Sequence, residues 1–465
     1  MNVGSLLPRH ARYRPDHPAV VCGRHRLTFR ELAAEVNRLC NALHALGLRK
    51  GDKVAVVLPN CVELLYAYRA CARMGLVSVP LSPLLRGAGL SSLLRDSDTA
   101  AVIACTAMVE ALDEVRDELL PRIAADRWIL TDAPADGGAR GYASYARLVR
   151  GASPEPPPPV ELADDDLYNI IYSSGTTGQP KGIVHTHYIR GMYCTQFAAQ
   201  YRMTPESVVL HAGSLVFNGA FVTLMPAWYQ GCTYVLMERF DAAEFIETVA
   251  RERVTHVMMV PSQIVAVMNA PNFAPEKLRS LEMLCSVGAP WHREHKERLL
   301  PVLPHSLYEL YGLTEGIITV LDRTDFAAHM DSVGTPIPFT EMKVVGDDGR
   351  ELPAGEVGEI VGRSPMLMPG YYKRPDLTAQ AIRDGWLYSG DVGAFDADGY
   401  LHLVDRKKDM IITGGVNVFP KDIEEVVVQH PAVREVAVFG VANEKWGESP
   451  FAAVALKRPG EVSAE

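Results

Sequence analysis

Apolar residues recur along the chain with the spacing of amphipathic helices. From Phe29 to Leu46 they return every three or four positions, which predicts a helix over residues 28–47. Thr28 and Glu31 have the spacing of a capping box at its start. Gly47 follows the last apolar position and has the backbone freedom that a helix end requires.

Short apolar runs predict β-strands between such helices. Further helices are predicted over 62–75 and 241–253, so that strands and helices alternate. This alternation predicts largely parallel sheets that are covered by helices, an α/β fold. The predicted strands of this part are 54–58, 76–80, 100–104, 170–172, 208–210, 234–237 and 257–260.

The pattern changes near Met342, where Gly and Pro break the chain into short strands and predict a smaller β-rich unit. Beyond a charged run at 406–409 the order is strand, helix, strand and strand, which predicts a small α+β domain. We expect a large region over 1–405, a hinge at 406–408 and a small domain over 409–465. The predicted elements of the small domain are strands 410–412, 436–441 and 451–456 and a helix over 420–429.

Length and composition narrow the function classes. A chain of 465 residues needs more than one hydrophobic core. The net charge of −10 argues against nucleic acid as a partner. The eight cysteines lack zinc-type spacing, and we expect most of them to be small buried residues in a reducing compartment. No signal peptide and no apolar span of about 18 residues is recognised, so we expect a cytoplasmic protein without an integral membrane segment.

Residues 172–182, with the sequence YSSGTTGQPKG, predict a loop that holds phosphate oxygens. Glycines let backbone amides approach an anion closely, and the hydroxyls add hydrogen-bond donors. Lys181 adds a compact positive charge. The loop is not a Walker A sequence, because the spacing of its glycines differs and Lys181 is followed by Gly182.

Four later segments, taken together with this loop, resemble the adenylate-forming superfamily. They are Gly288-Ala-Pro290, Tyr311-Gly-Leu-Thr-Glu315, Tyr388-Ser-Gly-Asp391, and Asp405-Arg-Lys-Lys-Asp409 followed by Gly414-Gly415. This superfamily contains acyl-CoA synthetases, adenylation domains of peptide synthetases and luciferases, and the chain most resembles the AMP-forming acyl-CoA synthetases. The resemblance implies a large N-terminal region of α/β subdomains with a β-barrel-like piece, and a small mobile C-terminal lid.

The resemblance also implies an ATP site. Thr314 would contact the α-phosphate, Glu315 would hold Mg²⁺, and Lys181, Thr314 and Glu315 would be the catalytic residues. Tyr311 would stack on adenine, and Asp391 would bind the ribose hydroxyls. The residues implied in ATP or AMP binding are Ser173, Ser174, Gly175, Thr176, Thr177, Gly178, Lys181, Gly288, Ala289, Pro290, Glu309 (adenine N6), Tyr311, Gly312, Thr314, Asp391 and Arg406.

The same resemblance places the hinge at Lys408 and the entry of coenzyme A at Gly414 and Gly415. His185 and His187 follow the phosphate loop and are expected to be structural. The expected acyl pocket is mainly apolar, and no acid stands where an α-ammonium group would need one. Its expected residues are Phe217, Asn218, Gly219, Val222, Ser262, Gln263 and Gly312, with Met225, Ile264, Ile317 and Ile318 nearby.

The expected function is that of an ATP-dependent, AMP-forming carboxylate–CoA ligase that acts on a fatty, alicyclic or aromatic acid, with ATP, Mg²⁺ and coenzyme A as cofactors. The sequence ends before the segment in which the family carries a catalytic lysine. We therefore expect an incomplete lid and slow adenylation. Three alternatives stay open: an adenylating enzyme that loads a carrier protein, a weakly active nucleotide-binding protein, and a luciferase-type oxygenase. Homodimerisation also stays open.

Overall fold

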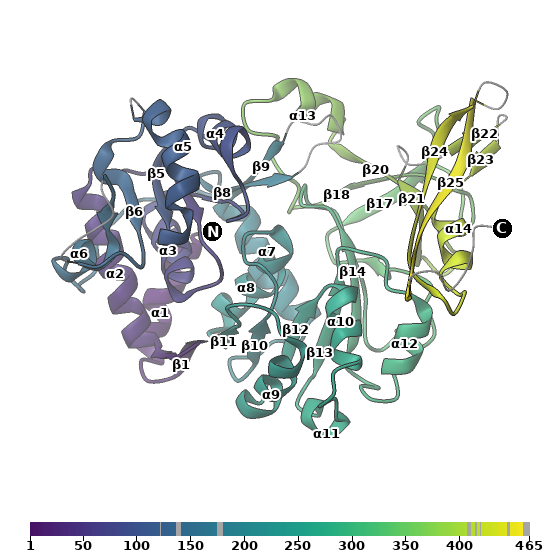
Figure 1. Ribbon diagram of the computed structural model, residues 1–465, viewed down its shortest axis with the longest axis horizontal. Helices are drawn as coiled ribbons and strands as arrows, with labels where there is room; N and C mark the ends of the chain where they lie inside the picture. Colours follow the sequence, from purple (N-terminus) through teal and green to yellow (C-terminus); the bar gives the residue numbers. More distant parts are fainter. Residues whose placement is uncertain are drawn as a thin grey trace.

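The computed structural model describes residues 1–120, 122–135, 141–173, 180–406, 411–413, 416–418, 420–443 and 447–458. Within these ranges the strands form four sheets. Two large sheets with their helices make up most of the molecule, and two smaller antiparallel sheets follow toward the C-terminus (Figure 1). The expected α/β architecture with a small C-terminal domain is confirmed.

The first large sheet has seven strands in the order β7-β6-β5-β3-β4-β8-β9. All its pairs are parallel except β8 with β9, which form an antiparallel hairpin at one edge. The bounds are β3 Lys53–Val57, β4 Val77–Pro80, β5 Thr99–Ala104, β6 Trp128–Leu130, β7 Ala143–Ser144, β8 Leu167–Ser173 and β9 Lys181–Thr186. The predicted strands of this part are therefore confirmed, with shifts of a few residues at their ends.

The second large sheet has nine strands in the order β16-β15-β14-β13-β12-β10-β11-β1-β2. Its centre is parallel, and antiparallel strands lie at both edges. The bounds are β1 Pro18–Cys22, β2 His25–Thr28, β10 Val208–His211, β11 Thr233–Leu236, β12 His256–Met259, β13 Met283–Val287, β14 Leu307–Gly312, β15 Ile318–Leu321 and β16 Thr335–Pro336. Parallel strands that are buried on both faces explain why these segments read as continuous apolar runs.

Helices cover both large sheets, as the alternation of elements predicted. The helices of the described residues, of which α13 and α14 pack against the two smaller sheets, are α1 Leu6–Tyr13, α2 Phe29–Ala45, α3 Val62–Met74, α4 Gly87–Asp96, α5 Val109–Leu119, α6 Tyr145–Arg150, α7 His187–Gln200, α8 Asn218–Gln230, α9 Ala242–Glu252, α10 Pro261–Met268, α11 Pro275–Leu278, α12 Arg293–Leu299, α13 Pro375–Ala381 and α14 Pro420–Val427. The capping box of α2 is present, because Thr28 accepts from the amide of Glu31 and the Glu31 carboxylate accepts from the amide of Thr28.

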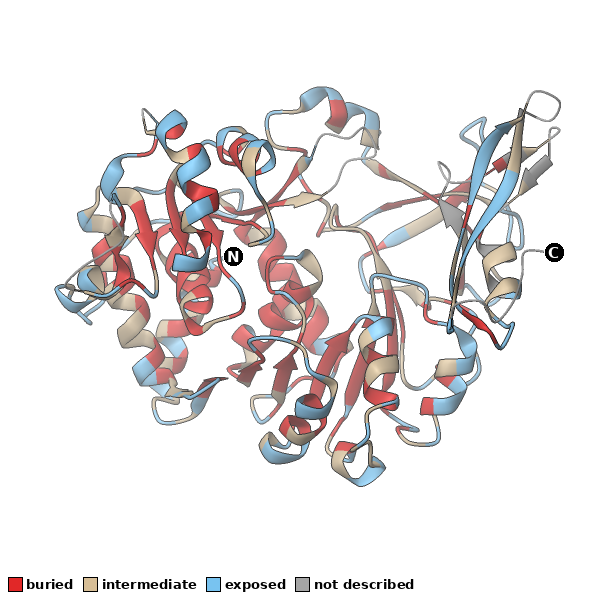
Figure 2. Ribbon diagram, viewed as in Figure 1, coloured by how far each residue is buried: buried red, intermediate tan, exposed pale blue. Residues whose placement is uncertain are grey.

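The two large sheets share one hydrophobic core. A single cluster of buried side chains includes Val54 and Val56 of β3, Val209 of β10 and Tyr234 of β11. Helices α7 and α8 lie between the sheets, where buried residues are dense (Figure 2). Because of this shared core, residues that extend from either sheet edge can be held at fixed positions relative to each other.

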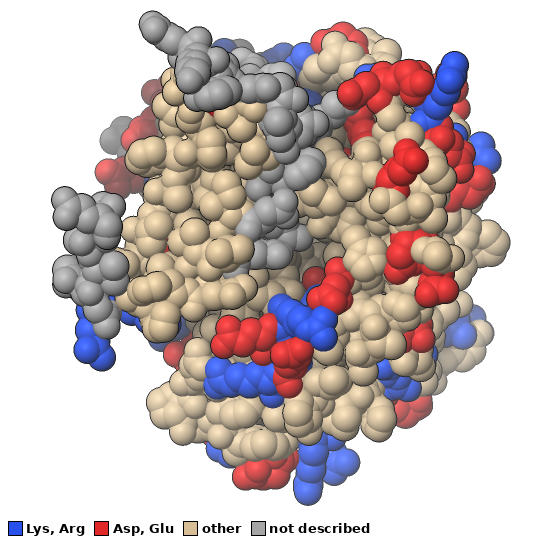
Figure 3. All heavy atoms as spheres, turned by 90° about the vertical axis from the view of Figure 1, so that its right-hand side faces the viewer, with Lys and Arg blue, Asp and Glu red and all other residues tan. Residues whose placement is uncertain are grey.

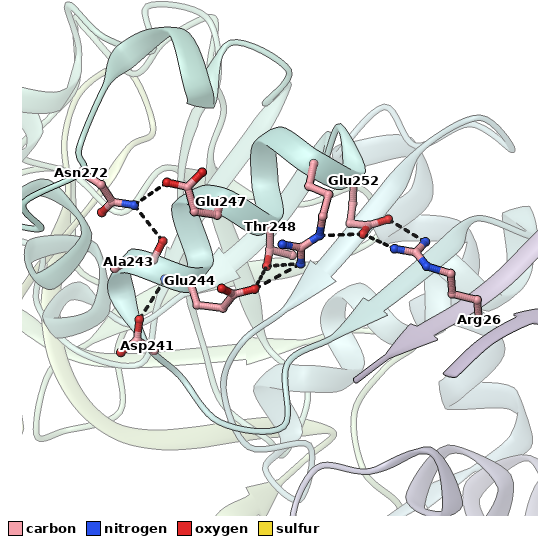
Figure 4. A network of polar contacts seen from close by, with 9 residues as sticks. Arg26, Asp241, Ala243, Glu244, Glu247, Thr248, Glu252 and Asn272 are labelled. Carbon is pink, nitrogen blue, oxygen red and sulfur yellow. Dashed lines mark hydrogen bonds and ion pairs between the residues drawn. The ribbon is translucent and has the colours of Figure 1, made fainter. Parts of the chain in front are cut away.

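Polar contacts also fix α9 beside the second sheet (Figure 4). The helix begins at Asp241, whose carboxylate accepts from the amide of Glu244 at 2.8 Å, as the sequence predicted. Near its other end, Glu252 accepts from both terminal nitrogens of Arg26 on β2, at 3.1 and 2.5 Å. A two-point contact of this kind orients the edge strand β2 over α9.

A five-stranded antiparallel sheet corresponds to the part expected to be barrel-like. Its strands are β17 Glu341–Val345, β18 Gly358–Arg363, β19 Ile382–Arg383, β20 Trp386–Phe395 and β21 Leu401–Arg406. Strands β17 and β21 each pair on one side only in the described residues, so this barrel-like piece is an open antiparallel sheet there.

The C-terminal sheet contains β22 Ile411–Thr413, β23 Val416–Val418, β24 Val433–Asn443 and β25 Gly447–Leu456. The last two form a long antiparallel ribbon that is largely exposed (Figure 2). On the face seen in Figure 3, the acidic and basic side chains of the described residues are interspersed. None of the helices in the described ranges combines the length and the apolar character needed to cross a bilayer.

A pair of glycines tests the packing of the second sheet. Gly334 has φ +83°, and a Cβ there would lie 2.1 Å from the backbone of Val320 and Leu321. Gly349 has φ +78° with nothing within 4 Å of such a Cβ. Both Gly→Ala variants bear the cost of a positive φ, about 1–2 kcal/mol. Gly334→Ala adds a backbone clash, so it should lower the melting temperature far more than Gly349→Ala. Equal effects would contradict the close approach of β16 to β15.

Candidate active site

The predicted phosphate loop connects the two strands of the β8–β9 hairpin. Ser173 at the end of β8 pairs with Lys181 at the start of β9, so the two stems of the loop lie side by side. Tyr172 donates to Asp96 of α4 at 2.5 Å and fixes the first stem to this helix. The predicted residues Ser174, Gly175, Thr176, Thr177 and Gly178 lie outside the described residues.

A second group of predicted residues meets at the carboxyl ends of two parallel strands. Strand β13 ends at Val287 and is followed by the predicted segment Gly288, Ala289 and Pro290. Strand β14 lies beside it and ends in Tyr311 and Gly312. The carboxyl ends of neighbouring parallel strands share one edge of a sheet, the usual position of a ligand site in α/β proteins. The two segments therefore lie close together, as the proposed walls of an adenine site require.

Thr314 and Glu315 lie in the tight connection between β14 and β15. A Cβ at Gly312 would lie 2.7 Å from the carbonyl oxygen of Ile317, and one at Gly316 would lie 2.2 Å from that of Met366. Gly316 also has φ +121°. Only glycine allows these close approaches, so the backbone on both sides of Thr314 and Glu315 is fixed by packing.

Hydrogen bonds hold the backbone of these two residues as well. The carbonyl of Thr314 is 2.9 Å from Nε2 of His185 on β9, and the carbonyl of Glu315 accepts from the amide of Met368 at 2.7 Å. The structural role expected for His185 is thereby confirmed. His187, at the start of α7, is fully buried and packs edge-on against Tyr168.

Tyr371 connects Glu315 to the base of the phosphate loop. Its hydroxyl donates to Oε1 of Glu315 at 2.8 Å, and its ring lies 5.2 Å from Nζ of Lys181. The chain on both sides of Tyr371 is hydrogen-bonded to β9, through the amide of Val184 to Gly370 and the amide of Tyr372 to Gly182. Lys181 and Glu315, which are 134 positions apart in sequence numbering, are thus held on one aromatic side chain.

Burial raises the pKa of Glu315 above its ordinary value. The hydrogen bond from Tyr371 and the charge of Lys181 act in the opposite direction, and the carboxylate of Asp391 raises the pKa further. A half-buried carboxylate beside a second acid is an environment that a cation would stabilise. Glu315 is therefore suited to bind a metal ion.

Asp391 and Tyr311 are brought together across two sheets. The hydroxyl of Tyr311, at the end of β14, donates to Oδ2 of Asp391 on β20 at 2.8 Å. Asp391 is 8% exposed and pairs in register with Arg406 of β21. The contact joins the segments that were expected to bind adenine and ribose.

Glu309 has a partner within the protein. Its carboxylate forms an ion pair with Lys296 of α12, and both side chains are buried. The ammonium of Lys296 also donates to the carbonyl of Met330 at 2.6 Å. The pair explains how an acid is tolerated inside β14. The adenine contact of Glu309 stays a prediction.

The residues expected around the acyl group divide into exposed and buried ones. Phe217 precedes α8 and is 59% exposed, and Asn218 and Gly219 form the first turn of this helix. Gly219 lies against Met258 of β12, the strand that leads into Ser262 and Gln263 of α10. Val222, Met225 and Ile318 belong to one buried core cluster, and Ile264 and Ile317 belong to two others. Core packing accounts for the burial of these side chains. The pocket role of Val222 stays a prediction.

Several predicted positions cannot be placed. Arg406 is the last residue of β21, and its side chain is outside the described part of the chain, as are Lys408, Gly414 and Gly415. Sequence reasoning missed Tyr371, Lys296 and Arg190, which contact predicted site residues. A lone tyrosine, lysine or arginine has no local pattern, so no sequence signal could have identified them.

Two family models match the chain. The model described as AMP-binding enzyme matches residues 7–372, and the model described as AMP-binding enzyme C-terminal domain matches residues 422–465. Among similar curated proteins, a feruloyl-CoA synthase from Amycolatopsis sp is 35% identical over 449 residues, which cover 96% of this chain and 87% of that protein. A long-chain-fatty-acid–CoA ligase, FadD13 of Mycobacterium tuberculosis, is 34% identical and covers 100% of this chain and 90% of the ligase.

Solved structures with the same fold include enzymes with bound nucleotides. ATP-bound MatB from Rhodopseudomonas palustris has a TM-score of 0.88 at 27% identity and covers 100% of this chain and 90% of that one. The o-succinylbenzoate CoA synthetase MenE from Bacillus subtilis, in complex with its acyl-adenylate intermediate, has a TM-score of 0.87 at 27% identity, with 99% and 89% covered. The family models, the similar ligases and the shared architecture agree, and the chain belongs to the AMP-binding enzyme family, the AMP-forming acyl-CoA synthetases and ligases.

Proposed function

We propose that the protein is an ATP-dependent carboxylate–CoA ligase that activates a hydrophobic acid as its acyl-adenylate and transfers the acyl group to coenzyme A. One observation carries the site assignment: Lys181, the segment with Tyr311 and Glu315, and Asp391 are distant in sequence but are connected by contacts through Tyr371 and between Tyr311 and Asp391. The names of the similar curated proteins support a hydrophobic acid, because they include ligases for ferulate and for long-chain fatty acids.

In this proposal the nucleotide lies across the carboxyl edge of the second sheet. Tyr311 and the segment Gly288–Pro290 enclose adenine, and Asp391 binds the ribose hydroxyls. Lys181 and Ser173, at the base of the loop, direct the β- and γ-phosphates. The reaction joins two anions, since a carboxylate attacks the α-phosphorus, and fixed donors and cations lower its barrier.

The residues present also fit Mg²⁺. This ion prefers oxygen ligands and is commonly held by one or two carboxylates together with substrate phosphates. Glu315 is a half-buried carboxylate with one oxygen fixed by Tyr371, which leaves the other oxygen for a cation in this proposal. When bound, Mg²⁺ neutralises charge on the phosphates. Glu315 and Asp391 would both be stabilised in their ionised forms.

The remaining steps follow from the order of the chemistry. Attack by the carboxylate oxygen on the α-phosphorus forms the mixed anhydride and releases pyrophosphate. Attack by the thiolate on the acyl carbon then forms the thioester and releases AMP. The thiol is that of coenzyme A, and transfer to a carrier-protein thiol is the outcome that would identify the alternative enzyme class. Cytoplasmic localisation and homodimerisation stay proposals.

A panel of acids tests the proposed function. Ferulate, octanoate, palmitate and indole-3-acetate are incubated with ATP, Mg²⁺ and coenzyme A, and AMP and the acyl-CoA product are measured. We expect AMP release with at least one acid, and Glu315→Ala should lose the activity by about 10²-fold or more. Nucleotide binding without AMP release for any acid would contradict the proposed function. AMP release that requires a pantetheinylated carrier protein would establish the alternative.

The raised pKa of Glu315 predicts that its ionised carboxylate, which the proposed function requires, lowers the stability of the folded protein. Since the folded state holds the Glu315 proton more tightly than the unfolded state, stability falls as pH rises from the unfolded pKa through the folded pKa. Glu315→Gln removes this pH-dependent loss and keeps an oxygen for Tyr371. We expect a higher melting temperature than that of the wild type at pH 7.5 and a smaller difference at pH 4, with activity lost. A melting temperature that is lower than the wild type at pH 7.5 would contradict this.

Two adjacent tyrosines test the contact with Glu315. Tyr371→Phe keeps the ring beside Lys181 but loses the donor to the carboxylate, so the pKa of Glu315 should rise further. The acidic limb of the pH–rate profile should move to higher pH, and kcat/KM should fall about tenfold or more, as for a lost hydrogen bond to a charged group. The Mg²⁺ concentration for half-maximal rate should rise.

Tyr372→Phe is the matched control, because Tyr372 donates to the carboxylate of Asp98 at 2.9 Å and its side chain lies away from Glu315. This variant should retain the wild-type pH profile and Mg²⁺ dependence. An unchanged acidic limb in Tyr371→Phe would show that the hydrogen bond does not set the ionisation of Glu315.

A further inference from the structure

Arg190 of α7 is a fully buried cation beside the candidate active site, with a relative exposure of 0%. In the part of the chain that the structure describes, no ion pair involves its guanidinium. The ionisable side chains around it include the imidazole of His185, the tyrosines Tyr68, Tyr168 and Tyr193, and the thiol of Cys194. Burial lowers the pKa of Arg190 but leaves an arginine charged at neutral pH.

Neutral groups from three elements hold the guanidinium. Nε donates to Oδ1 of Asn169 on β8 at 3.1 Å. Nη2 donates both to Nδ1 of His185 on β9 at 3.2 Å and to Oδ1 of Asn218 on α8 at 2.9 Å. The rings of Tyr193 and Phe221 lie 4.7 and 4.3 Å from its central carbon. The other terminal nitrogen, Nη1, has no hydrogen-bond partner among the described residues.

These contacts reach both sides of the proposed reaction. Because the guanidinium can only donate, Nδ1 of His185 must accept, and the imidazole proton is on Nε2. Nε2 therefore donates to the carbonyl of Thr314 at 2.9 Å. On the other side Arg190 orients the amide of Asn218, which donates to the hydroxyl of Tyr193 at 3.2 Å. Thr314 belongs to the proposed phosphate side, and Asn218 to the proposed acyl side.

An uncompensated charge in this position is costly for the fold. A buried ion normally has a partner of opposite charge, and its absence costs several kcal/mol. Charge in a low-dielectric interior also acts over a longer distance than charge in water. A positive potential that is not cancelled inside the protein stabilises an anion that enters nearby.

We propose that Arg190 is a positioning residue whose uncompensated charge favours the substrate carboxylate, and that it acts through Asn218 and His185 without touching the substrate. The proposal rests on the proposed function and specifies it further. The acid is attracted in its ionised form by the protein interior, in addition to Lys181 at the base of the phosphate loop. A neutral ligand of the same shape gains nothing from this charge.

Asn169→Asp gives the sharpest test. Asn169 is fully buried on β8 and is not among the residues proposed to touch a ligand, and its Nδ2 has no partner among the described residues. Aspartate has nearly the same shape and would supply the missing countercharge to Arg190. The variant should keep or raise the melting temperature, yet weaken the binding of the carboxylate.

The ligands are the panel acid that the wild type turns over fastest and the primary amide of that acid, such as ferulate and feruloyl amide. Their dissociation constants are measured by calorimetry with α,β-methylene ATP present. In Asn169→Asp we expect the affinity for the acid to fall about tenfold and that for the amide to change less than about twofold, since only the acid is charged. The KM of ATP should change little compared with the KM of the acid.

Arg190→Met and Arg69→Met form a matched pair that does not depend on how Asn169→Asp folds. Arg69 of α3 is also buried, lies 4.1 Å from the ring of Trp228 and has no ion pair in the described residues. Only Arg190→Met should discriminate against the acid relative to the amide, and Arg190→Lys should restore part of this preference.

The possible results separate the two hypotheses. An active wild type whose Asn169→Asp and Arg190→Met variants weaken acid and amide equally, or neither of them, would overturn the role of Arg190. The same holds if Arg69→Met discriminates between acid and amide as Arg190→Met does. A wild type that releases no AMP with any acid would instead refute the proposed function.

Discussion

The hydrogen bonds between the segment Met368–Tyr372 and strand β9 are the contacts on which the rest of the candidate site depends. Through them one short stretch fixes the stem of the phosphate loop and, through Tyr371 and Met368, both the side chain and the backbone of Glu315. The two large sheets supply separate parts of the site, and this stretch contacts both of these parts. A rigid connection matters because a group displaced by about 1 Å loses much of its effect on a reaction.

The site region also contains buried charges with different degrees of compensation. Glu309 and Lys296 neutralise each other within the protein. Glu315 accepts a hydrogen bond from Tyr371, whose ring lies near Lys181. Arg190 has only neutral partners in the described residues. We interpret this difference as follows: the ion pair of Glu309 and Lys296 stabilises the fold, and Glu315 and Arg190 are available to interact with ligands in the proposed function. The fold tolerates the cost because each charge is hydrogen-bonded by elements of the shared core.

Much of the architecture could be predicted from sequence because its signals are local. The capping box of Thr28 and Glu31 and the apolar runs of β3, β5 and β10 each depend on neighbours within one element. The family resemblance predicted the residues of the motifs. It could not predict the residues that contact them, because these contacts depend on the tertiary structure. Tyr371 reaches Glu315 from 56 positions away, and Arg190 reaches Asn218 from 28, and neither has a periodic or motif-like context. The short strands broken by glycine predicted a β-rich unit but not which strands pair in it, because strand pairing is set by tertiary contacts.

The register of β20 and β21 has a consequence for how a moving small domain would sense its ligand. Asp391 lies directly opposite Arg406, which is the last described residue before the expected pivot. A swing that begins there would start one strand away from the proposed sugar contact. Binding of the nucleotide at Asp391 would then rigidify the β20–β21 pair, at the end of which the rotation of the small domain would begin. Nucleotide binding and the orientation of the small domain would therefore both depend on this pair of strands. Such coupling needs no long-range pathway, because the two events would be separated by only one pair of backbones.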